Sequence, residues 1–315
     1  MTVTSSGSGV SLSHSGSSLA PRSKRRLEAF ARGGFAVAAG VSVLTTIGII
    51  IALLLPSLEF FREVSVIEFV FGDRWAPRFA DASFGVLPLV SATLWTTAIA
   101  LTFAIPLGLG AAIFLAEYAS TRLRKVLKPV LELLAGIPTV VYGLFALFFI
   151  QSVVIKDIFG WETGTFSVLA AGFVMGVMII PTIASISEDA MSAVPMSMRQ
   201  GSAALGANRM QTSLRVVFPA AISGIVAAII LGVSRAVGET MIVAIAAGQQ
   251  ARVVTGLLEQ GQTMTGFIAS AALGDSRVGS IEYNTLFAVG LLLFILTLTI
   301  NFIAISFVRR IRKEY

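Results

Sequence analysis

Long stretches without charged residues constrain this chain more than any other feature of its sequence. A bilayer core about 30 Å thick needs about 20 consecutive apolar residues for each helix that crosses it. Five charge-free stretches reach that length: 33–58, 82–116, 133–155, 163–187 and 283–308. Another, which begins after Arg215, is interrupted only by Arg235 and Glu239. Because only 13% of the 315 residues are charged, the sequence predicts an all-α integral membrane protein with six transmembrane helices.

Basic residues are unevenly distributed between the two sides that these spans define. The side with both termini and the connections after the second and fourth spans carries 16 Lys and Arg residues, against 6 on the other side. By the positive-inside rule, both termini of this predicted multi-pass inner or plasma membrane protein are cytoplasmic. The net charge of +6 is scattered over loops that flank the membrane, which favours contact with membrane lipid over nucleic acid.

Composition also divides the chain along its length. Residues 1–20 contain eight serines, three glycines and no charged side chain, too little apolar surface to offset the entropy of folding. The predicted organisation is a disordered cytoplasmic tail with a basic flank (1–32), a transmembrane domain (33–310) and a cytoplasmic C-terminus (311–315). Cysteine is absent and the one histidine lies in the tail, so no metal site is expected.

Two smaller features concern packing. Gly172 and Gly176 form a small-xxx-small face in the fourth span, which predicts close approach of another helix. Glu132, near the cytoplasmic end of the third span, is expected to snorkel or to pair with Lys128, and no transport role is assigned to it.

The cytoplasmic connection over residues 188–219 contains the most informative motif. Residues 199–206 read Arg-Gln-Gly-Ser-Ala-Ala-Leu-Gly, and after nine more residues the chain continues Val-Val-Phe-Pro, ending at Pro219. This order resembles the EAA loop of ABC-importer permeases, which reads Glu-Ala-Ala, three residues, Gly, nine residues, Ile-x-Leu-Pro. Here Gln200, Gly201 and Ser202 occupy the Glu-Ala-Ala positions, and Gly206 is retained.

The physical basis of this motif is mechanical. A short helix with small residues can lie closely in a groove of another protein, and a glycine allows the chain to reverse before the next helix. The resemblance therefore implies that Gln200, Gly201, Ser202, Gly206 and Pro219 couple the chain to a cytoplasmic ATPase. The alternative interpretation is an amphipathic helix on lipid, favoured by basic residues in the connection.

Phosphate-cradling chemistry is missing from this sequence. Neither Gly-Lys-Ser nor Gly-Lys-Thr occurs, so the chain contains no P-loop signature. We therefore expect no cofactor bound by this chain, and ATP to be hydrolysed by a separate subunit.

Further motifs are similar to those of the phosphate-specific permeases known as Pst. These are residues 134–143 (Leu-Ala-Gly-Ile-Pro-Thr-Val-Val-Tyr-Gly), 187–195 (Ser-Glu-Asp-Ala-Met-Ser-Ala-Val-Pro) and 234–241 (Ser-Arg-Ala-Val-Gly-Glu-Thr-Met). The last motif and the Leu-Phe-Ala-Val-Gly that ends at Gly290 resemble the C-type subunit. The resemblance implies a MetI-like permease architecture and import of inorganic phosphate. Its implied partners are an A-type sibling permease, two copies of a cytoplasmic ATPase and an extracytoplasmic phosphate-binding protein.

The charged residues within the interrupted span are the candidate transport residues. Counting about 1.5 Å per residue from Ala220 puts Arg235 about 22 Å into the helix, past the bilayer midplane. Insertion of a central arginine costs roughly 2.5 to 3.5 kcal/mol, so its side chain is expected to face a partner or an aqueous pathway. In a continuous helix Glu239 lies on the same face, in the less favourable order for a pair, which indicates partners on other helices.

Two roles stay open for Arg235 and Glu239, which together form the predicted substrate pathway or gate. In the first, the planar guanidinium of Arg235 attracts phosphate oxygens while Glu239 holds it in position. In the second, the two side chains form an ion-pair latch between helices.

Other functions remain as alternatives at this point. A permease for another oxyanion fits the same motifs, and a proton- or sodium-driven carrier could titrate Glu239 but would not require an EAA-like loop. A membrane-embedded enzyme would need paired carboxylates, histidine ligands or a Ser-His-Asp set within the spans. No such set is visible in the sequence, and no catalytic residue is predicted.

Overall fold

The computed structural model describes residues 22–311, with the side chains of 22–27, 29 and 307–311 left out. The predicted disordered tail over 1–20 and the last residues of the predicted cytoplasmic C-terminus lie outside the described residues. The chain divides into two compact units, Met1–Ala52 and Leu53–Tyr315.

The described part of the first unit is a single helix, the beginning of α1 (Arg22–Glu63). This helix starts well before Gly33, so the basic flank of the predicted tail is helical. The described side chains of this part, Glu28 and residues 30–52, are exposed almost throughout, and the candidate span Phe30–Glu63 has a mean hydropathy of 2.5. An exposed helix of this composition requires lipid or another protein as its surroundings.

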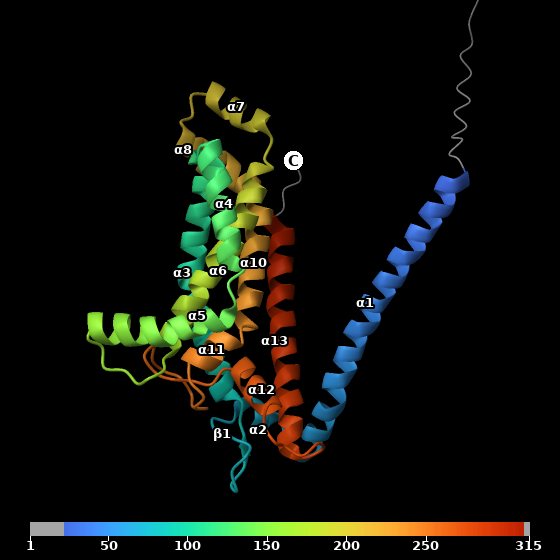
Figure 1. The fold of residues 1–315 in the computed structure, drawn as a ribbon, viewed down its shortest axis with the longest axis vertical. Coiled ribbons are helices and arrows are strands. Elements are labelled where there is room, and N and C mark those ends of the chain that lie inside the picture. Colours follow the sequence, from blue (N-terminus) through green and yellow to red (C-terminus); the bar gives the residue numbers. More distant parts are fainter. Residues whose placement is uncertain (1–21, 312–315) are drawn as a thin grey trace, which may run out of the picture. The chain divides into compact units, whose positions relative to one another are not determined.

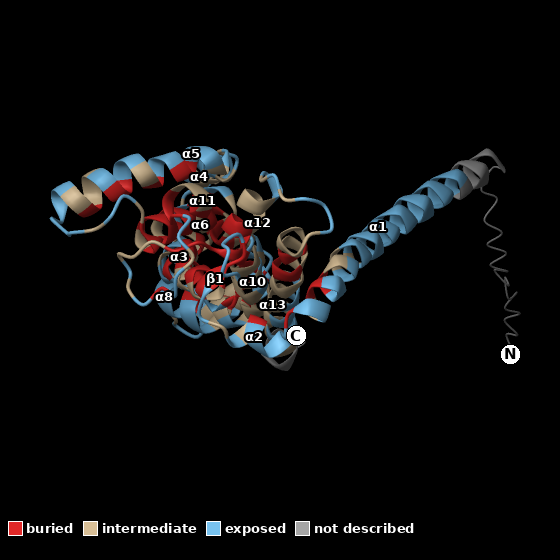
Figure 2. Ribbon diagram, turned by 90° about the horizontal axis from the view of Figure 1, so that it is seen from below, coloured by how far each residue is buried: buried red, intermediate tan, exposed pale blue. Residues whose placement is uncertain are grey.

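The second unit is a helix bundle built around α3 (Leu87–Ile113) and α6 (Val168–Ser192), which lie side by side (Figure 1). A Cβ atom at Gly172 would come within 2.9 Å of the Thr96 carbonyl oxygen. One at Gly176 would come within 2.8 Å of the Ala100 carbonyl oxygen. The predicted small-residue face is therefore confirmed as the contact surface between these helices, and buried residues gather there (Figure 2).

The remaining long helices and the segments at the ends complete the second unit. Helices α10 (Ile222–Val237) and α13 (Ile281–Ile311) pack against the bundle. Two long connections that are predicted to face outward, about residues 56–85 and 248–283, are called the outward segments. They contain α2 (Val66–Phe71), the two-residue strands β1 (Trp75–Ala76) and β2 (Ser83–Phe84), and α12 (Met264–Ala272). The strands pair antiparallel, with Trp75 opposite Phe84. Apart from this ladder, the regular structure of the described residues is helical.

The predicted third span, 133–155, is broken in the structure. Helix α4 (Thr121–Ala135) ends before Gly136, and a new helix begins at Thr139 as α5 (Thr139–Phe145) and continues in π-helical form as η2 (Ala146–Ile158). Pro138 precedes the new helix, where its missing N–H costs no intrahelical hydrogen bond. The two pieces run in different directions, and the second lies across the direction of α3 and α6 (Figure 1). Contiguous apolar residues predicted the span but not this break.

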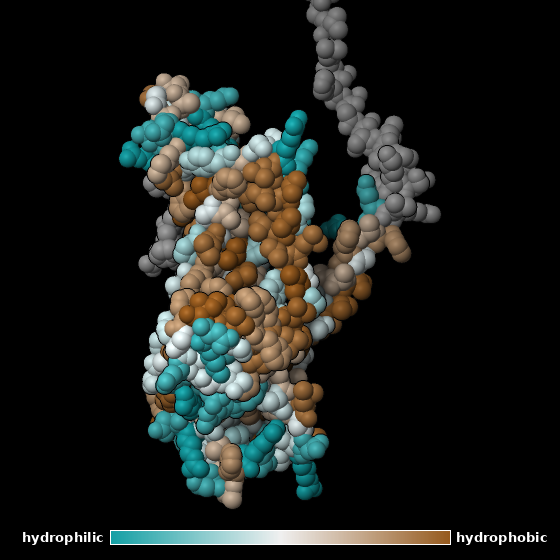
Figure 3. All heavy atoms as spheres, turned by 60° about the vertical axis from the view of Figure 1, so that its left-hand side comes forward, coloured by the Kyte–Doolittle hydropathy of each residue, from teal (hydrophilic) through white to brown (hydrophobic). Residues whose placement is uncertain are grey.

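By length and composition, the described residues contain five helices that could cross a membrane, among them the crosswise Thr139–Ile158. The count reaches the predicted six if Arg209–Ala220 and Ile222–Val237, with a bend of 71° between them, form one span. Figure 3 shows apolar side chains over the middle of the second unit and polar ones toward its two ends. The prediction of a helical multi-pass membrane protein is confirmed.

A buried polar network fastens the crosswise helix to the outward segments. Gln151 is fully buried, and its amide nitrogen donates to the Gly164 carbonyl at 2.8 Å while its oxygen accepts from the Ser167 hydroxyl at 2.6 Å. The hydroxyl of Thr163 donates onward to the Leu258 carbonyl at 3.0 Å. The polar groups of this network are therefore paired within the protein.

Replacing Gln151 by leucine is expected to destabilise the protein by about 2 kcal/mol, because the Ser167 hydroxyl and the Gly164 carbonyl lose buried partners. Thermal unfolding of the purified protein in detergent measures this loss. The control is Ser152→Leu, which adds the same side chain at an exposed neighbouring position and should leave the unfolding temperature unchanged. Equal stability of the two variants would contradict a stabilising role for the network.

Candidate functional site

The interrupted span bends before it reaches Arg235 and Glu239, and its last helix ends between these two residues. It starts with α8 (Arg209–Thr212), η3 (Ser213–Val217) and α9 (Phe218–Ala220), bends, and continues as α10 to Val237. Residues 238–240 separate α10 from α11 (Met241–Ala246). The chain therefore continues through the bundle as α10 and α11, with a break at residues 238–240 between them.

Arg235 lies in the last turn of α10 and is half-buried. Its Nη1 donates a hydrogen bond to Oγ1 of Thr182 on α6 at 3.2 Å. Among the described residues no carboxylate lies within ion-pair distance of its guanidinium. A positive charge at this position, near the carbonyl end of α10, keeps most of its donors available for another ligand.

Glu239 lies in the break and is 8% exposed. Its carboxylate oxygen Oε1 accepts hydrogen bonds from the backbone N–H groups of Met241 at 3.0 Å and Ile242 at 3.2 Å. A carboxylate stabilises the first turn of a helix because the N–H groups there have no intrahelical partner. The Thr265 hydroxyl also donates to the Glu239 carbonyl at 2.6 Å, which ties the break to α12.

The structure corrects the predicted relation between Arg235 and Glu239. Because α10 ends at Val237, they do not share a helical face, and no ion pair joins them in the described part of the chain. The prediction of an ion-pair latch between Arg235 and Glu239 is therefore wrong. The expectation that Arg235 finds a partner on another helix is confirmed by its bond to Thr182.

The two broken helices meet inside the bundle. A Cβ atom at Gly143, in α5, would lie 2.9 Å from Cδ1 of Ile245 and 3.3 Å from Cα of Ile242, both in α11. The Tyr142 hydroxyl donates back across the other break to the Leu134 carbonyl at 2.8 Å. Two motifs that looked permease-like in the sequence, 134–143 and 234–241, thus both form helix breaks, and helices that begin at these breaks pack together. In membrane transporters, broken helices near the middle of the membrane form substrate sites.

The connection over residues 188–219, which is predicted to be cytoplasmic, contains the expected short helix and reversal. Helix α7 (Met196–Ala204) is followed by Gly206, whose φ of +80° is a conformation that favours glycine. Asn208 then starts α8 with a capping box that it shares with Gln211.

The predicted coupling residues occupy different positions on this segment. Gln200, Gly201 and Gly206 are exposed, while the Ser202 hydroxyl lies 2.9 Å from the Thr212 hydroxyl and Pro219 falls in α9. The most prominent apolar side chain of the segment is Leu205, at 90% exposure, which the motif comparison did not single out.

Charged contacts at the helix ends near α7 were missed from the sequence. The fully buried Glu188 on α6 binds Arg124 and Lys128 of α4, and Lys128 also binds Asp189. Of the two expectations for Glu132, pairing with Lys128 is therefore wrong, and snorkelling stays a prediction. The available signal was an acidic residue in a strongly basic region, within the motif 187–195.

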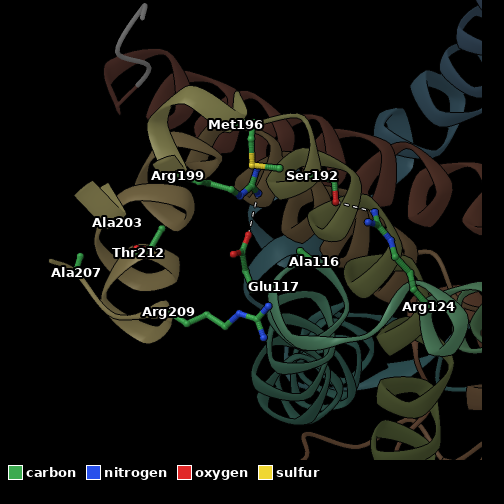
Figure 4. A pocket seen from close by; sticks show the side chains of 10 residues that line it. All are labelled: Ala116, Glu117, Arg124, Ser192, Met196, Arg199, Ala203, Ala207, Arg209 and Thr212. Atoms are coloured by element: carbon green, nitrogen blue, oxygen red, sulfur yellow. Dashed lines mark hydrogen bonds and ion pairs between the residues drawn. The ribbon is translucent and has the colours of Figure 1, made fainter. Parts of the chain in front are cut away.

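A second such contact lies beside a cavity of about 530 Å³ next to residues 196–210, which are called the coupling segment (Figure 4). There Arg199 of α7 binds Glu117, at the end of the second span, at 2.8 Å. Glu117 is the residue that terminates the second charge-free stretch.

Broken spanning helices around a half-buried arginine are typical of a membrane subunit of a transport system. Residues 104–313 match the family described as "Binding-protein-dependent transport system inner membrane component", and the chain belongs to this family.

Curated relatives cover most of the chain. The probable ABC transporter permease protein YqgH of Bacillus subtilis is 39% identical over 261 residues, which cover 82% of this chain and 83% of YqgH. The phosphate transport system permease protein PstC of Mesorhizobium japonicum is 32% identical over 261 residues, covering 78% of this chain and 79% of PstC. The predicted resemblance to ABC-importer permeases of the Pst type is confirmed.

Among solved structures, the inward-facing MetNI methionine ABC transporter is similar with a TM-score of 0.56 and 22% identity. The similarity covers 72% of this chain and 97% of that one. It confirms the predicted MetI-like architecture.

Proposed function

We propose that this chain is the permease subunit of an ATP-driven importer and that it moves inorganic phosphate across the membrane. The observation that carries the proposal is Arg235, which reaches α6 beside two helix breaks without an acidic partner among the described residues. The phosphate transport role that PstC has by name supports this choice of substrate.

The chemistry of the site suits an oxyanion. The guanidinium of Arg235 presents a planar fork of donors that matches two phosphate oxygens, and the Thr182 hydroxyl beside it adds a further polar group. Glu239 is bound by the N–H groups of α11 and forms no ion pair with Arg235 among the described residues. This arrangement favours direct contact of Arg235 with substrate over a latch, and it leaves Glu239 to hold the break in place. A proton-driven carrier is less well supported, because such a carrier would not require an EAA-like loop.

The proposal includes the partners that the sequence resemblance implied. An ATPase, in two copies, supplies the hydrolysis for which this chain has no P-loop, and it docks on residues 196–210. An A-type sibling permease completes the pathway, and an extracytoplasmic phosphate-binding protein delivers substrate. The family description, which names binding-protein-dependent transport, supports the last of these partners.

Both termini are proposed to be cytoplasmic, on the side of α7. The basic asymmetry of 16 residues against 6 supports this orientation. Single cysteines at Ser202 and at Leu273 check it, since the chain has no native cysteine. A membrane-impermeant thiol reagent should label intact cells at position 273 and leave position 202 unlabelled. Labelling at 202 alone would reverse the orientation.

Reconstitution tests the function itself. The chain is placed in liposomes with its candidate sibling permease, ATPase and binding protein, and ATP-dependent entry of phosphate, sulfate and molybdate is compared. Phosphate should enter fastest, and only with ATP. Faster entry of sulfate or molybdate would show that another oxyanion is the substrate. Uptake driven by a proton gradient without ATP would contradict the proposal of an ATP-driven importer.

A further inference from the structure

The side chain of Arg199 connects α7, the proposed coupling helix, to the ends of two spanning helices. Its Nη2 donates to Oε1 of Glu117 at 2.8 Å and to the Met191 carbonyl at 2.9 Å, and its Nη1 donates to the Val194 carbonyl at 2.7 Å. Glu117 lies in η1 (Phe114–Tyr118), the π-helical turn that continues α3. Met191 lies in the last turn of α6, and Val194 lies in the short connection that follows, just before α7. One guanidinium therefore joins α7 to the cytoplasmic ends of both α3 and α6.

These contacts are shielded from water. The Arg199 side chain is 17% exposed and the Glu117 side chain 8%. Carbonyls at the end of a helix attract a positive charge, because the helix dipole is negative there. Arginine can bind a carboxylate and two carbonyls at once through its planar fork, whereas a lysine ammonium is a point donor. The geometry is thus specific for arginine opposite a carboxylate.

The cavity beside Arg199 and Glu117 increases the importance of their contact for holding α7 in place. About 530 Å³ lies between the coupling segment and the ends of α3 and α4, lined by Ala116, Ala203 and Ala207 among others. On this side of α7, contact with η1 therefore depends on the bond between Arg199 and Glu117, whereas Met198 of α7 packs against the apolar cluster that contains Ala112 of α3. Figure 4 shows Glu117 and Arg199 pointing toward each other beside this space.

A separate cluster makes the end of α6 rigid. Glu188 binds Arg124 and Lys128 of α4, and the Ser192 hydroxyl donates to Glu188 at 2.9 Å while it accepts from Arg124 at 2.7 Å. Since α6 is fastened to α4 in this way, a force that reaches Arg199 is passed to a group of helices.

We propose that Glu117 is a positioning residue for ATP-driven transport, which acts by holding Arg199 so that the coupling helix moves together with α3 and α6. This inference rests on the proposed function. Without the Glu117 contact, α7 still docks on the ATPase, but its displacement is no longer passed to α3. ATP hydrolysis then continues with less transport.

The experiment uses the complete transporter in liposomes and measures phosphate imported per ATP hydrolysed. Glu117→Gln keeps the shape of the side chain and removes its charge. We expect the ATPase to co-purify as with the wild type, and the ratio of phosphate to ATP to fall about fivefold or more. Glu259→Gln is the matched control, because it removes a carboxylate paired with Arg252 in the outward segment and should keep the wild-type ratio.

Arg199→Lys provides a second variant in case Glu117→Gln does not assemble. It keeps the charge but lacks the fork, so the ratio should fall in the same direction. An assembled variant of either kind whose ratio stays within about twofold of the wild type would overturn the inference. Wild-type liposomes separate the two proposals: if they import no phosphate with ATP, the proposed function fails, whereas normal wild-type import with unchanged variants removes only the role of Glu117.

Discussion

Arg235→Gln is expected to lower ATP-dependent phosphate uptake by about 100-fold or more, while the protein still inserts and assembles. Glutamine retains hydrogen-bonding capacity toward Thr182 but removes the only charge that α10 places beside the helix breaks. Arg235→Lys keeps that charge without the planar fork. Near-complete loss with lysine would support direct contact with phosphate oxygens, whereas substantial uptake would favour an electrostatic gate.

Two further variants make the measurement specific. Arg277→Gln, which removes an exposed arginine from the outward segment, should transport normally. The Arg235→Gln, Glu239→Gln double variant tests the pair as a unit, because losing both should cost less than the sum of the single losses if they serve one network. Normal uptake by a correctly inserted double variant would rule out an essential role for both residues.

Leu205→Asp should weaken binding of the cytoplasmic ATPase by about 30-fold or more, as loss of a central apolar contact does in other interfaces. Leu205 follows α7 at the reversal and is 90% exposed, and its neighbours Gln200 and Gly201 are exposed and uncharged. The missing glutamate of the EAA pattern therefore leaves an uncharged, partly apolar surface for docking. Co-purification of the ATPase with the tagged chain measures the effect.

The chain supplies its own control for this substitution. Leu273 also follows a helix, α12, and is also 90% exposed, but it belongs to the outward segment. Leu273→Asp should leave ATPase binding unchanged. Gly206→Val tests the backbone, because no atom lies within 4 Å of the added Cβ position and only the φ of +80° opposes the substitution. Full ATPase binding by both Leu205→Asp and Gly206→Val would remove this segment from the docking site.

The membrane character and the coupling segment were accessible from contiguous residues. Six apolar stretches predicted the spans, because insertion into lipid depends on the summed hydrophobicity of neighbouring side chains. The Gly172 and Gly176 spacing predicted a close helix contact without identifying α3 as the partner. The reversal at Gly206 was also local, since a positive φ is a property of one residue and its neighbours.

The helix breaks were only partly accessible. Pro138 marks one of them, but Gly238 does not by itself end a helix, and the interpretation of Arg235 and Glu239 as neighbours on one face assumed that α10 continued. The break depends on contacts that come from elsewhere, such as the Thr265 hydroxyl on the Glu239 carbonyl. A local pattern cannot contain such contacts.

The charged contacts were the feature least predictable from the sequence, because they depend on how the helices pack. Glu188 meets Arg124 across 64 positions of sequence, and Arg199 meets Glu117 across 82. Several cationic side chains lie near the cytoplasmic ends of the helices, so charge alone does not identify which of them each carboxylate binds. Helix packing resolves this, because burial makes an unpaired carboxylate costly and leaves only the residues that the bundle brings within reach. The residues that carry charge were therefore visible in the sequence, and their partners followed from the packing of α3, α4, α6 and α7.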